Sequence, residues 1–463
     1  MAAPKTANDF GVGSVPRTIL RMAIPITLAQ LINILYNIVD RMYIGHIDGA
    51  GTLALTGLGL CLPVISVVMA FSRLAGMGGA PLCSIERGRG DLEEAEQLMG
   101  HSFTLLLIFG VVLTILGEIF LEPILYAFGA SDATIGYALD YGRIYLAGNI
   151  FVMISLGMNS FINAQGFARI GMMTTLLGAV ANILLDPLFI FVFGWGVKGA
   201  ALATILSQGL GALWVMQFLT GKKAILRLRK RCMGLQLHRV KRITALGFSG
   251  FVMAMTNSVV QVVNNTVLAT FGGDLYVGIM TVINSVREVL TMPVMGISSA
   301  SEPVMGFNYG AQKPRRVRQG IHFISIFAIS YSVLAWLLVR LFPTAFISIF
   351  NDDPALIAAG VPALNLYFFT FFMMAAQFAG QSTFVALGKS KQATFFSIFR
   401  KVIVVVPLTL WLPHVGGLGV DGVFWAEAIS NVVGGIACYG TMLLTVYFPL
   451  KKTERDTAAP EGK

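Results

Sequence analysis

The sequence predicts an all-α integral membrane protein in which twelve transmembrane helices form two parallel, pseudo-symmetric six-helix bundles. Three observations support this class: the composition, a series of long apolar stretches, and an internal repeat. The chain is 56% hydrophobic and only 12% charged, with a mean hydropathy of +0.76. An ordinary soluble domain carries charge on about a quarter of its residues, so this composition indicates a chain built for a bilayer.

The apolar stretches are long enough to cross the hydrocarbon core of a membrane, which is roughly 30 Å thick and takes about 20 helical residues. At this hydrophobicity only helices satisfy their own backbone in lipid, and a barrel would show short alternating segments instead. We expect helices at approximately 18–43, 52–81, 100–123, 141–164, 171–193, 197–219, 243–270, 276–305, 320–342, 358–386, 393–413 and 421–448.

The basic residues explain the net charge of +10 without a nucleic-acid partner. Most of the 33 Lys and Arg residues fall in the N-terminal segment, in alternate loops and at the C-terminus. Arg73 and Arg287 are the only ones that we place deep within spans. By the positive-inside rule, both termini are cytoplasmic and the protein is a multi-pass protein of the plasma (inner) membrane. The four basic residues expected on the opposite side are Arg41, Arg143, Lys198 and Arg340.

The N-terminal segment and the cysteines indicate no further function. The first seventeen residues lack the short apolar core and cleavage site of a removable signal peptide, so we expect the first helix to insert the chain. The cysteines are scattered without metal-ligand spacing and receive no chemistry here. We expect no cofactor. These cysteines are Cys61, Cys83, Cys232 and Cys438.

An internal repeat divides the chain into two halves. A shift of 222 residues aligns Pro81 with Pro303 and Gly166 with Gly388, and a shift of 223 aligns "GVKGAALATILS" with "GVDGVFWAEAIS". Each half holds six helices, an even number, so the halves share one orientation in the membrane. Two such bundles can rock to expose a central cavity to alternate sides, as secondary transporters do.

The repeat defines the expected domains. They are a tail (1–17), an N-lobe (18–220), a basic linker (221–242), a C-lobe (243–448) and a second tail (449–463). We interpret the linker as a cytoplasmic connection, in the form of an amphipathic helix on anionic lipid, with a regulatory role as the alternative.

Acidic residues in the first repeat are the main functional candidates, because charge inside a bilayer is expensive. Asp40 lies about 28 Å along the first helix from Arg21, so it is either an interfacial residue at the outer rim or part of a site. Asn182 and Asp186 are four residues apart on one face of the fifth helix, at a similar depth, and Thr204 is also in the outer half.

These oxygen-bearing groups suit a monovalent cation, Na⁺ included, or a shared proton. Pro25 and Pro187 interrupt helical hydrogen bonding near them, so their helices can bend. Bending would link protonation to the shape of a cavity.

The second repeat has no equivalent acidic cluster. Its seventh helix offers amides rather than acids, and its tenth combines Met and Phe residues with amides. Such a wall would suit varied, partly apolar cations. The candidate cavity residues are Met255, Asn257, Gln377 and Gln381. We expect Glu302 to snorkel or to cap a loop, and Arg287 and Glu288 to point apart on their helix and find other partners.

The sequence resembles the multidrug and toxic compound extrusion family of efflux transporters over nearly its whole length. The pattern at Pro25, Asn37 and Asp40, the segments "NILLDP" and "GVKGAALAT", and the motif from Pro303 to Ala311 carry the likeness. The resemblance implies two V-shaped lobes and export of organic cations and drugs in exchange for protons or sodium. We expect a monomer with small-molecule substrates.

The likeness is to the branch whose amino-terminal lobe holds the cation site. Matched residue by residue, that site falls on Asp40, Asn182, Asp186 and Thr204, and a supporting polar network falls on Tyr36, Asn37, Tyr141 and Asn159. The other large bacterial branch has acids in helices seven and ten. Here Met255 to Asn257 and Ala376 to Gln377 occupy those places, which argues against a carboxyl-terminal cation site of that kind.

Three other functions fit the sequence less well: a lipid-linked precursor flippase, a membrane enzyme and a channel. A lipid-linked precursor flippase of the same fold usually presents a basic central cavity, which the few deep cations disfavour. An integral membrane enzyme should cluster His, Cys or acids, whereas the five His residues are dispersed near helix ends; we therefore predict that the protein is not an enzyme. A channel fits asymmetric repeats around a closed polar site less well than alternating access.

Overall fold

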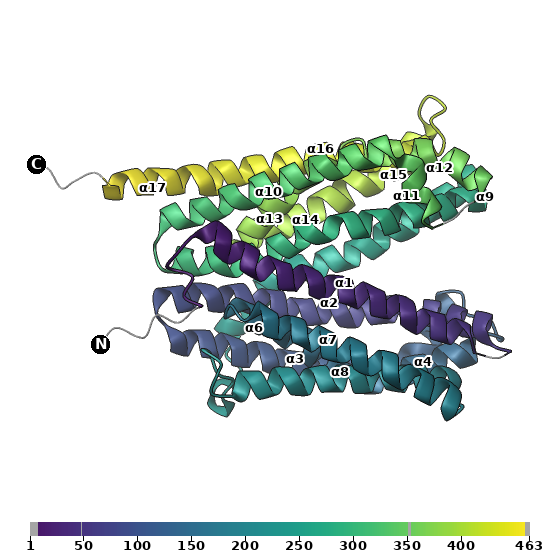
Figure 1. Cartoon of the computed structure of the whole chain (residues 1–463), viewed down its shortest axis with the longest axis horizontal. Helices are drawn as coiled ribbons and strands as arrows, with labels where there is room; N and C mark the ends of the chain where they lie inside the picture. Colours follow the sequence, from purple (N-terminus) through teal and green to yellow (C-terminus); the bar gives the residue numbers. More distant parts are fainter. Residues whose placement is uncertain (1–7, 48, 351–352, 459–463) are drawn as a thin grey trace, which may run out of the picture. The chain divides into compact units, whose positions relative to one another are not determined.

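The structure is a computed structural model that describes residues 8–47, 49–350 and 353–458. Within these residues the chain is 87% helix and has no strand, which confirms the predicted fold class. The first half of the chain is shown in Figure 1 from purple to teal. Its helices are α1 (Val15–Gly45), α2 (Gly51–Arg89), α3 (Leu92–Ala127), α4 (Ile135–Ala147), α5 (Asn149–Met153), α6 (Asn159–Ala164), α7 (Ala168–Pro187) and α8 (Gly196–Thr220).

The second half begins with one very long helix and continues to the C-terminal tail. Its helices are α9 (Leu237–Gly310), α10 (Pro314–Leu341), α11 (Pro343–Ser348), α12 (Pro354–Tyr367), α13 (Phe371–Ala386), α14 (Ser390–Ile398), α15 (Val406–Trp411), α16 (Asp421–Met442) and α17 (Phe448–Ala458). Wider π-helical turns at Ile154–Met158, Leu188–Val192, Phe399–Val405 and Leu443–Tyr447 continue several of these helices.

The described helices supply the twelve expected spans. Nine are long and apolar enough to cross a membrane, and two bent pairs bring the number to 11. These pairs bend by 59° between Ala147 and Asn149 and by 45° between Tyr367 and Phe371. Gly273, at φ 67° and ψ −167°, breaks α9 into two, which makes the twelfth span. Only glycine adopts this backbone conformation without strain.

The chain forms two compact units that do not follow the helix ends. Among the described residues, unit 1 comprises 8–9 and Ile24–Phe251, and unit 2 comprises Phe10–Ala23 and the chain from Val252 onward. Both α1 and α9 therefore pass from one unit to the other within a continuous helical element. The domain ranges expected from the sequence remain a prediction.

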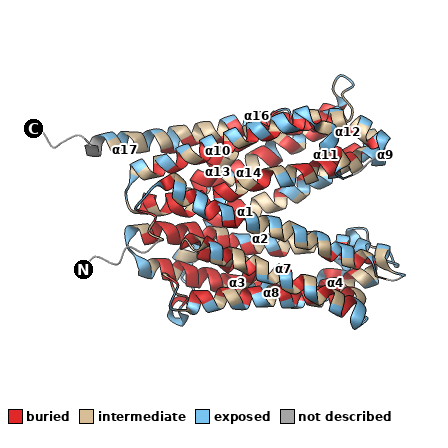
Figure 2. Ribbon diagram, viewed as in Figure 1, coloured by how far each residue is buried: buried red, intermediate tan, exposed pale blue. Residues whose placement is uncertain are grey.

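Burial in each unit is concentrated between its helices, whereas the outward faces carry exposed residues (Figure 2). Many exposed residues are large and apolar, such as Leu184 and Leu213 in unit 1, which are 66% and 68% exposed. Outward apolar side chains are what a lipid environment requires of a helical bundle. In unit 1 the start of α9 lies directly against α2, where Gly78 and Gly247 bring the two backbones together.

The basic segment between the halves differs from the expectation of an amphipathic helix. Among its residues before α9, only Lys230–Cys232 are helical, as one short 3₁₀ turn. The segment packs on α2 and α3 instead. Cys232 is fully buried, and Thr104 Oγ1 donates to the Met233 carbonyl at 2.8 Å. Ion pairs hold it in place because its charges meet acids on α2 and α3: Arg242 pairs with Glu86 at 2.6 Å and with Glu94 at 3.0 Å.

Candidate functional site

Three of the predicted coupling residues meet in the interior of unit 1. Asn182 and Asp186 lie one turn apart on α7, and Asn182 Nδ2 donates to Asp186 Oδ1 at 3.2 Å. The carboxyl group of Asp40, near the end of α1, lies within hydrogen-bonding range of that of Asp186. All three side chains are buried: Asp186 is fully covered, Asn182 is 1% exposed and Asp40 is 7% exposed.

The cluster has fewer hydrogen-bond donors than acceptors. Asp40 Oδ1, Asn182 Oδ1 and Asp186 Oδ2 are buried and have no hydrogen-bond partner in the described part of the chain. A buried acceptor without a donor is destabilising by about 1–3 kcal/mol. Two facing carboxyl groups in a low-dielectric interior also repel each other when both are ionised. A proton or a monovalent cation between them would satisfy these oxygens and remove the repulsion.

Tyrosine and hydroxyl groups surround the carboxyl pair. Tyr141 on α4 lies beside Thr204 on α8 and within electrostatic range of Asp40. Tyr36, one turn before Asp40, lies near Gln208 and within electrostatic range of Asp40. The Asn37 amide instead donates to the Asn33 carbonyl at 2.7 Å and to Asn33 Oδ1 at 2.8 Å. Polar side chains from α1, α4 and α8 therefore gather around the carboxyl pair.

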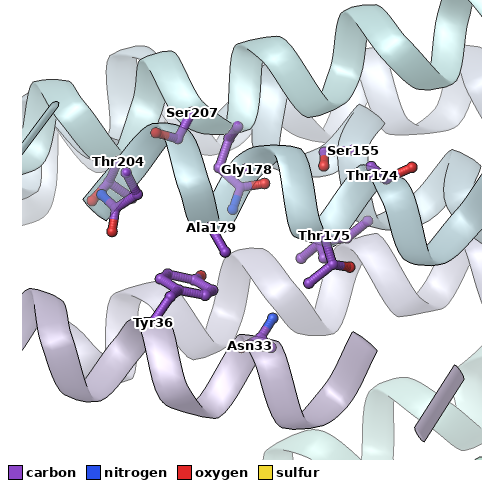
Figure 3. Close-up of a pocket in the computed structure, with 12 residues that line it drawn as sticks. Asn33, Tyr36, Ser155, Thr174, Thr175, Gly178, Ala179, Thr204 and Ser207 are labelled. Atoms are coloured by element: carbon purple, nitrogen blue, oxygen red, sulfur yellow. The ribbon is translucent and has the colours of Figure 1, made fainter. Parts of the chain in front are cut away.

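A polar pocket opens beside this network in unit 1. In Figure 3, Asn33 and Tyr36 project from α1 toward Thr175, Ala179 and Thr204 on the facing helices. Small residues on α7 leave this space open. The lining residues are Asn33, Tyr36, Ser155, Leu156, Thr174, Thr175, Gly178, Ala179, Asn182, Thr204, Ser207 and Gln208.

Asn159 lies in a different network. Its Nδ2 donates to the Gly171 carbonyl at 3.2 Å, and its Oδ1 accepts from Thr174 Oγ1 at 3.2 Å. Thr174 is twelve residues before Asp186 on the same helix, which corresponds to about 18 Å. Asn159 thus ties α6 to α7 and does not contact the carboxyl pair, and the Asn37 amide donates to Asn33 rather than to the pair.

Of the two predicted bending prolines, Pro187 lies at a change in helical geometry, whereas Pro25 lies within the uninterrupted helix α1. Pro25 is inside α1, two residues after the point at which the chain passes from unit 2 to unit 1. Pro187 ends α7, and the π-helical turn Leu188–Val192 follows it directly. Asp186 therefore lies immediately before a change in helical geometry.

The predicted cavity residues of the second repeat are spread over two helices of unit 2. Met255 and Asn257 are on α9, where Asn257 is exposed. Gln381 on α13 donates to the Ala393 carbonyl at 2.8 Å and to Ser397 Oγ at 2.9 Å, so its amide joins α13 to α14. The side-chain oxygen of Gln377 is buried with no partner among the described residues.

Unit 2 contains a charged cluster that the sequence analysis missed. Arg400 and Lys401 fall inside the expected span 393–413, but we counted their charges with the preceding cytoplasmic loop; the structure buries both, at 6% and 9% exposure. Each pairs with Glu427 on α16, Lys401 Nζ at 3.1 Å. Arg287 lies within electrostatic range of Glu427 and Tyr367. The statement that Arg73 and Arg287 are the only deep cations is therefore wrong.

The internal repeat held the signal for this cluster. The aligned segments starting at Gly196 and Gly419 place Thr204 opposite Glu427. Glu427 is thus an acid at the position equivalent to Thr204, and a buried acid in a membrane span usually has a cation as its partner on a neighbouring helix. In contrast, within the described ranges no group of three or more His, Cys, Asp or Glu residues could hold a metal ion.

Comparison with known proteins places the chain in a family. The MatE family model matches residues 25–188 and 250–411, which is most of the chain. The chain belongs to the MatE family. The first matched range contains Asp40, Asn182 and Asp186, and the second contains Arg400 and Lys401, whereas Thr204 and Glu427 lie outside both ranges.

Relatives of this MatE protein match it along nearly their whole length. The multidrug export protein MepA of Staphylococcus haemolyticus is 24% identical over 426 residues, covering 92% of each chain. An FAD transporter of Shewanella oneidensis is 24% identical and covers 97% of this chain and 99% of its own. A solved structure of a MOP superfamily transporter from Pyrococcus furiosus has a TM-score of 0.90 at 24% identity and covers 97% of this chain and 100% of its own. These structural similarities support the twelve-helix fold.

Proposed function

We propose that this MatE-family protein is a secondary active multidrug efflux antiporter that exports organic cations in exchange for H⁺ or Na⁺ by alternating access. It would act in the plasma membrane with both termini in the cytoplasm. The observation that carries the proposal is the buried pair of Asp40 and Asp186. In this pair, Asp40 Oδ1 and Asp186 Oδ2 accept no hydrogen bond from any described residue.

The coupling step follows from the electrostatics of that pair. In the ion-free state, two facing carboxylates would repel each other in a medium that screens them poorly. Binding of a proton, or of Na⁺ with Asn182 and Thr204 supplying further oxygens, would neutralise part of this charge. Because hard cations prefer oxygen ligands, the same residues can serve either ion.

The two prolines would convert ion binding into movement. Pro25 has no amide hydrogen to donate within α1, and Pro187 precedes the π-helical turn after α7. Both helices can therefore bend without losing a complete hydrogen-bond ladder. A change in the attraction between Asp40 and Asp186 would act directly on these two helices and alter the pocket beside them.

The relatives favour export of small molecules. The MepA protein of Staphylococcus haemolyticus is a multidrug exporter that matches this chain over nearly its whole length. The flippase alternative would need deep cations that face a central cavity. In unit 2, Arg400 and Lys401 share the carboxylate of Glu427, which offsets part of their charge, and the multidrug export relative supports efflux, so we favour the antiporter.

The test is efflux of a fluorescent organic cation from proteoliposomes under imposed proton or sodium gradients, applied separately. We compare the native protein with Asp40→Asn and Asp186→Asn. Both variants keep the size of the side chain but remove the ionisable group, so we expect gradient-driven efflux to fall by at least tenfold in each. The gradient that drives the native protein identifies the coupling ion.

Asp140→Asn is the matched control. Asp140 is also on a helix of unit 1, but its side chain is 44% exposed and pairs with Lys198 at 3.4 Å. We expect its efflux to equal that of the native protein. Normal, gradient-dependent efflux in both Asp40→Asn and Asp186→Asn would show that these acids are structural and that the coupling site has been placed wrongly.

A further inference from the structure

The charged cluster of unit 2 occupies the position that the polar pocket occupies in unit 1. The repeat shift of 222 takes Gly178 and Ala179 to Arg400 and Lys401. The shift of 223 takes Thr204 to Glu427. Gly178, Ala179 and Thr204 line the pocket of unit 1. The repeat has therefore kept the location of a site while replacing small and hydroxyl side chains with charged ones.

The cluster is deep in a membrane span. Arg400 and Lys401 lie near the middle of the span Ser390–His414, and Glu427 is six residues into α16. Charged groups at this depth are rare and usually mark a functional site. Arg400 and Lys401 also lie in the π-helical turn Phe399–Val405. Such turns occur frequently at functional sites because they displace side chains from the regular helical positions.

The charges of the cluster do not balance. Arg400 and Lys401 share the carboxylate of Glu427, and Arg287 adds a third positive group within electrostatic range. Glu288 lies within electrostatic range of Arg287, so three cations face two acids. A buried excess of positive charge is unfavourable unless an anion compensates it. An additional negative group bound at the cluster would therefore offset its excess positive charge.

Unused hydrogen-bonding atoms surround the same place. Arg400 Nε, Gln377 Oε1 and Asn431 Oδ1 are buried without a partner among the described residues, and Arg400 and Asn431 are 6% and 2% exposed. Gly434 allows the approach, since a Cβ there would lie 3.1 Å from both Arg400 Cγ and Gln377 Oε1. An amide can turn its nitrogen or its oxygen to one position, so both amides can add donors.

We propose that unit 2 holds an anion-binding subsite in which Arg400 and Lys401 bind the carboxylate of a transported solute. The planar guanidinium of Arg400 matches a carboxylate through two parallel hydrogen bonds, and Lys401 adds a point charge. Glu427 occupies these donors when no solute is bound and competes with the solute for them. This subsite rests on the proposed efflux function and extends its substrates to zwitterions that carry a carboxylate.

The test uses two dyes that differ only in this group. Tetramethylrhodamine methyl ester is a cation, and the corresponding free acid carries a carboxylate. Binding of each dye to the full-length protein in detergent is measured by fluorescence polarisation. Because Glu427 competes with the solute, we expect Glu427→Gln to tighten binding of the acid by ~3-fold or more and to leave the ester unchanged.

Arg400→Lys keeps the positive charge but removes the planar guanidinium that can donate two parallel hydrogen bonds. We therefore expect it to weaken binding of the acid by roughly tenfold and to leave binding of the ester unchanged. Lys391→Gln, an exposed basic position at the start of the same span, is the control and should behave as native. The double variant Arg400→Gln/Glu427→Gln removes both members of the ion pair and provides a folded comparison if a single variant is unstable. It should lose the preference for the acid.

Failure of the subsite and failure of the efflux function give different results. An acid-to-ester affinity ratio that is the same in native protein, Glu427→Gln and Arg400→Lys overturns the subsite, as does absence of acid binding by the native protein. Both readouts need no ion gradient. Absence of gradient-driven export of the ester by the native protein in proteoliposomes instead contradicts the efflux function itself.

Discussion

Gly247 on α9 should be among the least replaceable positions of unit 1. A Cβ added there would lie 1.8 Å from the Leu74 carbonyl oxygen and 3.1 Å from the Cα of Gly78. Gly78 has the reciprocal constraint, since its Cβ would lie 2.1 Å from the Ile243 carbonyl oxygen. Ordinary van der Waals contact begins near 3.4 Å. Gly247→Ala therefore forces the two helix backbones apart by more than 1 Å.

The expected loss of stability follows from this displacement. Overpacking of side chains costs about 1–3 kcal/mol, and here the obstacle is rigid backbone, so we expect about 3 kcal/mol or more. For a unit of about 200 residues, each kcal/mol shifts the melting temperature by about 2–4 °C. We therefore expect Gly247→Ala to lower the Tm by roughly 6–12 °C.

Gly250→Ala is the matched comparison, three residues further along α9. Its Cβ would meet the sulfur of Met77 at 3.1 Å, and a flexible methionine can move away. We expect a Tm within about 2 °C of native for this variant. The assay is thermal unfolding of purified protein in detergent, followed by fluorescence-detected size exclusion. A Tm for Gly247→Ala that equals that of Gly250→Ala would refute the close approach of α2 and α9.

Three further substitutions test the linker and the site. Arg242→Ala should lower the free energy of unfolding by about 2 kcal/mol, because it removes an ion-pair partner from the buried carboxylate of Glu86. Arg231→Ala is the control: Arg231 is exposed and lies 3.8 Å from Glu93, so its loss should leave the Tm unchanged. Thr204→Val removes the hydroxyl that lies beside Tyr141 near the carboxyl pair, and we expect gradient-driven efflux to fall about three- to tenfold at unchanged expression. Normal efflux in this variant would show that Thr204 is not part of the coupling site. Asn159→Ala should lower the Tm by a few degrees yet leave efflux per folded molecule intact, and a selective loss of coupling would return it to the cation site.

The sequence predicted the helices well because their signal is local. A stretch of about 20 apolar residues must form a helix in lipid, whatever its neighbours do. The expected spans at 243–270 and 276–305, for example, match the two parts of α9 on either side of Gly273. The linker was predicted less well because its conformation depends on partners far away in the chain. Its arginines bind acids on α2 and α3, and no local periodicity reports such contacts.

The candidate site shows the same division. The spacing of Asn182 and Asp186 places them on one face of a helix, and the sequence alone contains that spacing. That Asp40 reaches them, and that Asn159 does not, depends on how α1, α6 and α7 pack against one another. Sequence distance from a helix end gives depth in the membrane but not direction around the helix bundle.

The sequence by itself determined the membrane location, the number of helices, the repeat and the acids of the first half, because hydrophobicity, chain length and residue identity fix these properties locally. Only the tertiary structure decided the place of Arg400 and Lys401. The expected span 393–413 contains these two adjacent cations, but only the fold shows that Glu427, on another helix, pairs with both. Burial of charge depends on the partner that compensates its desolvation, and that partner is brought near only by folding.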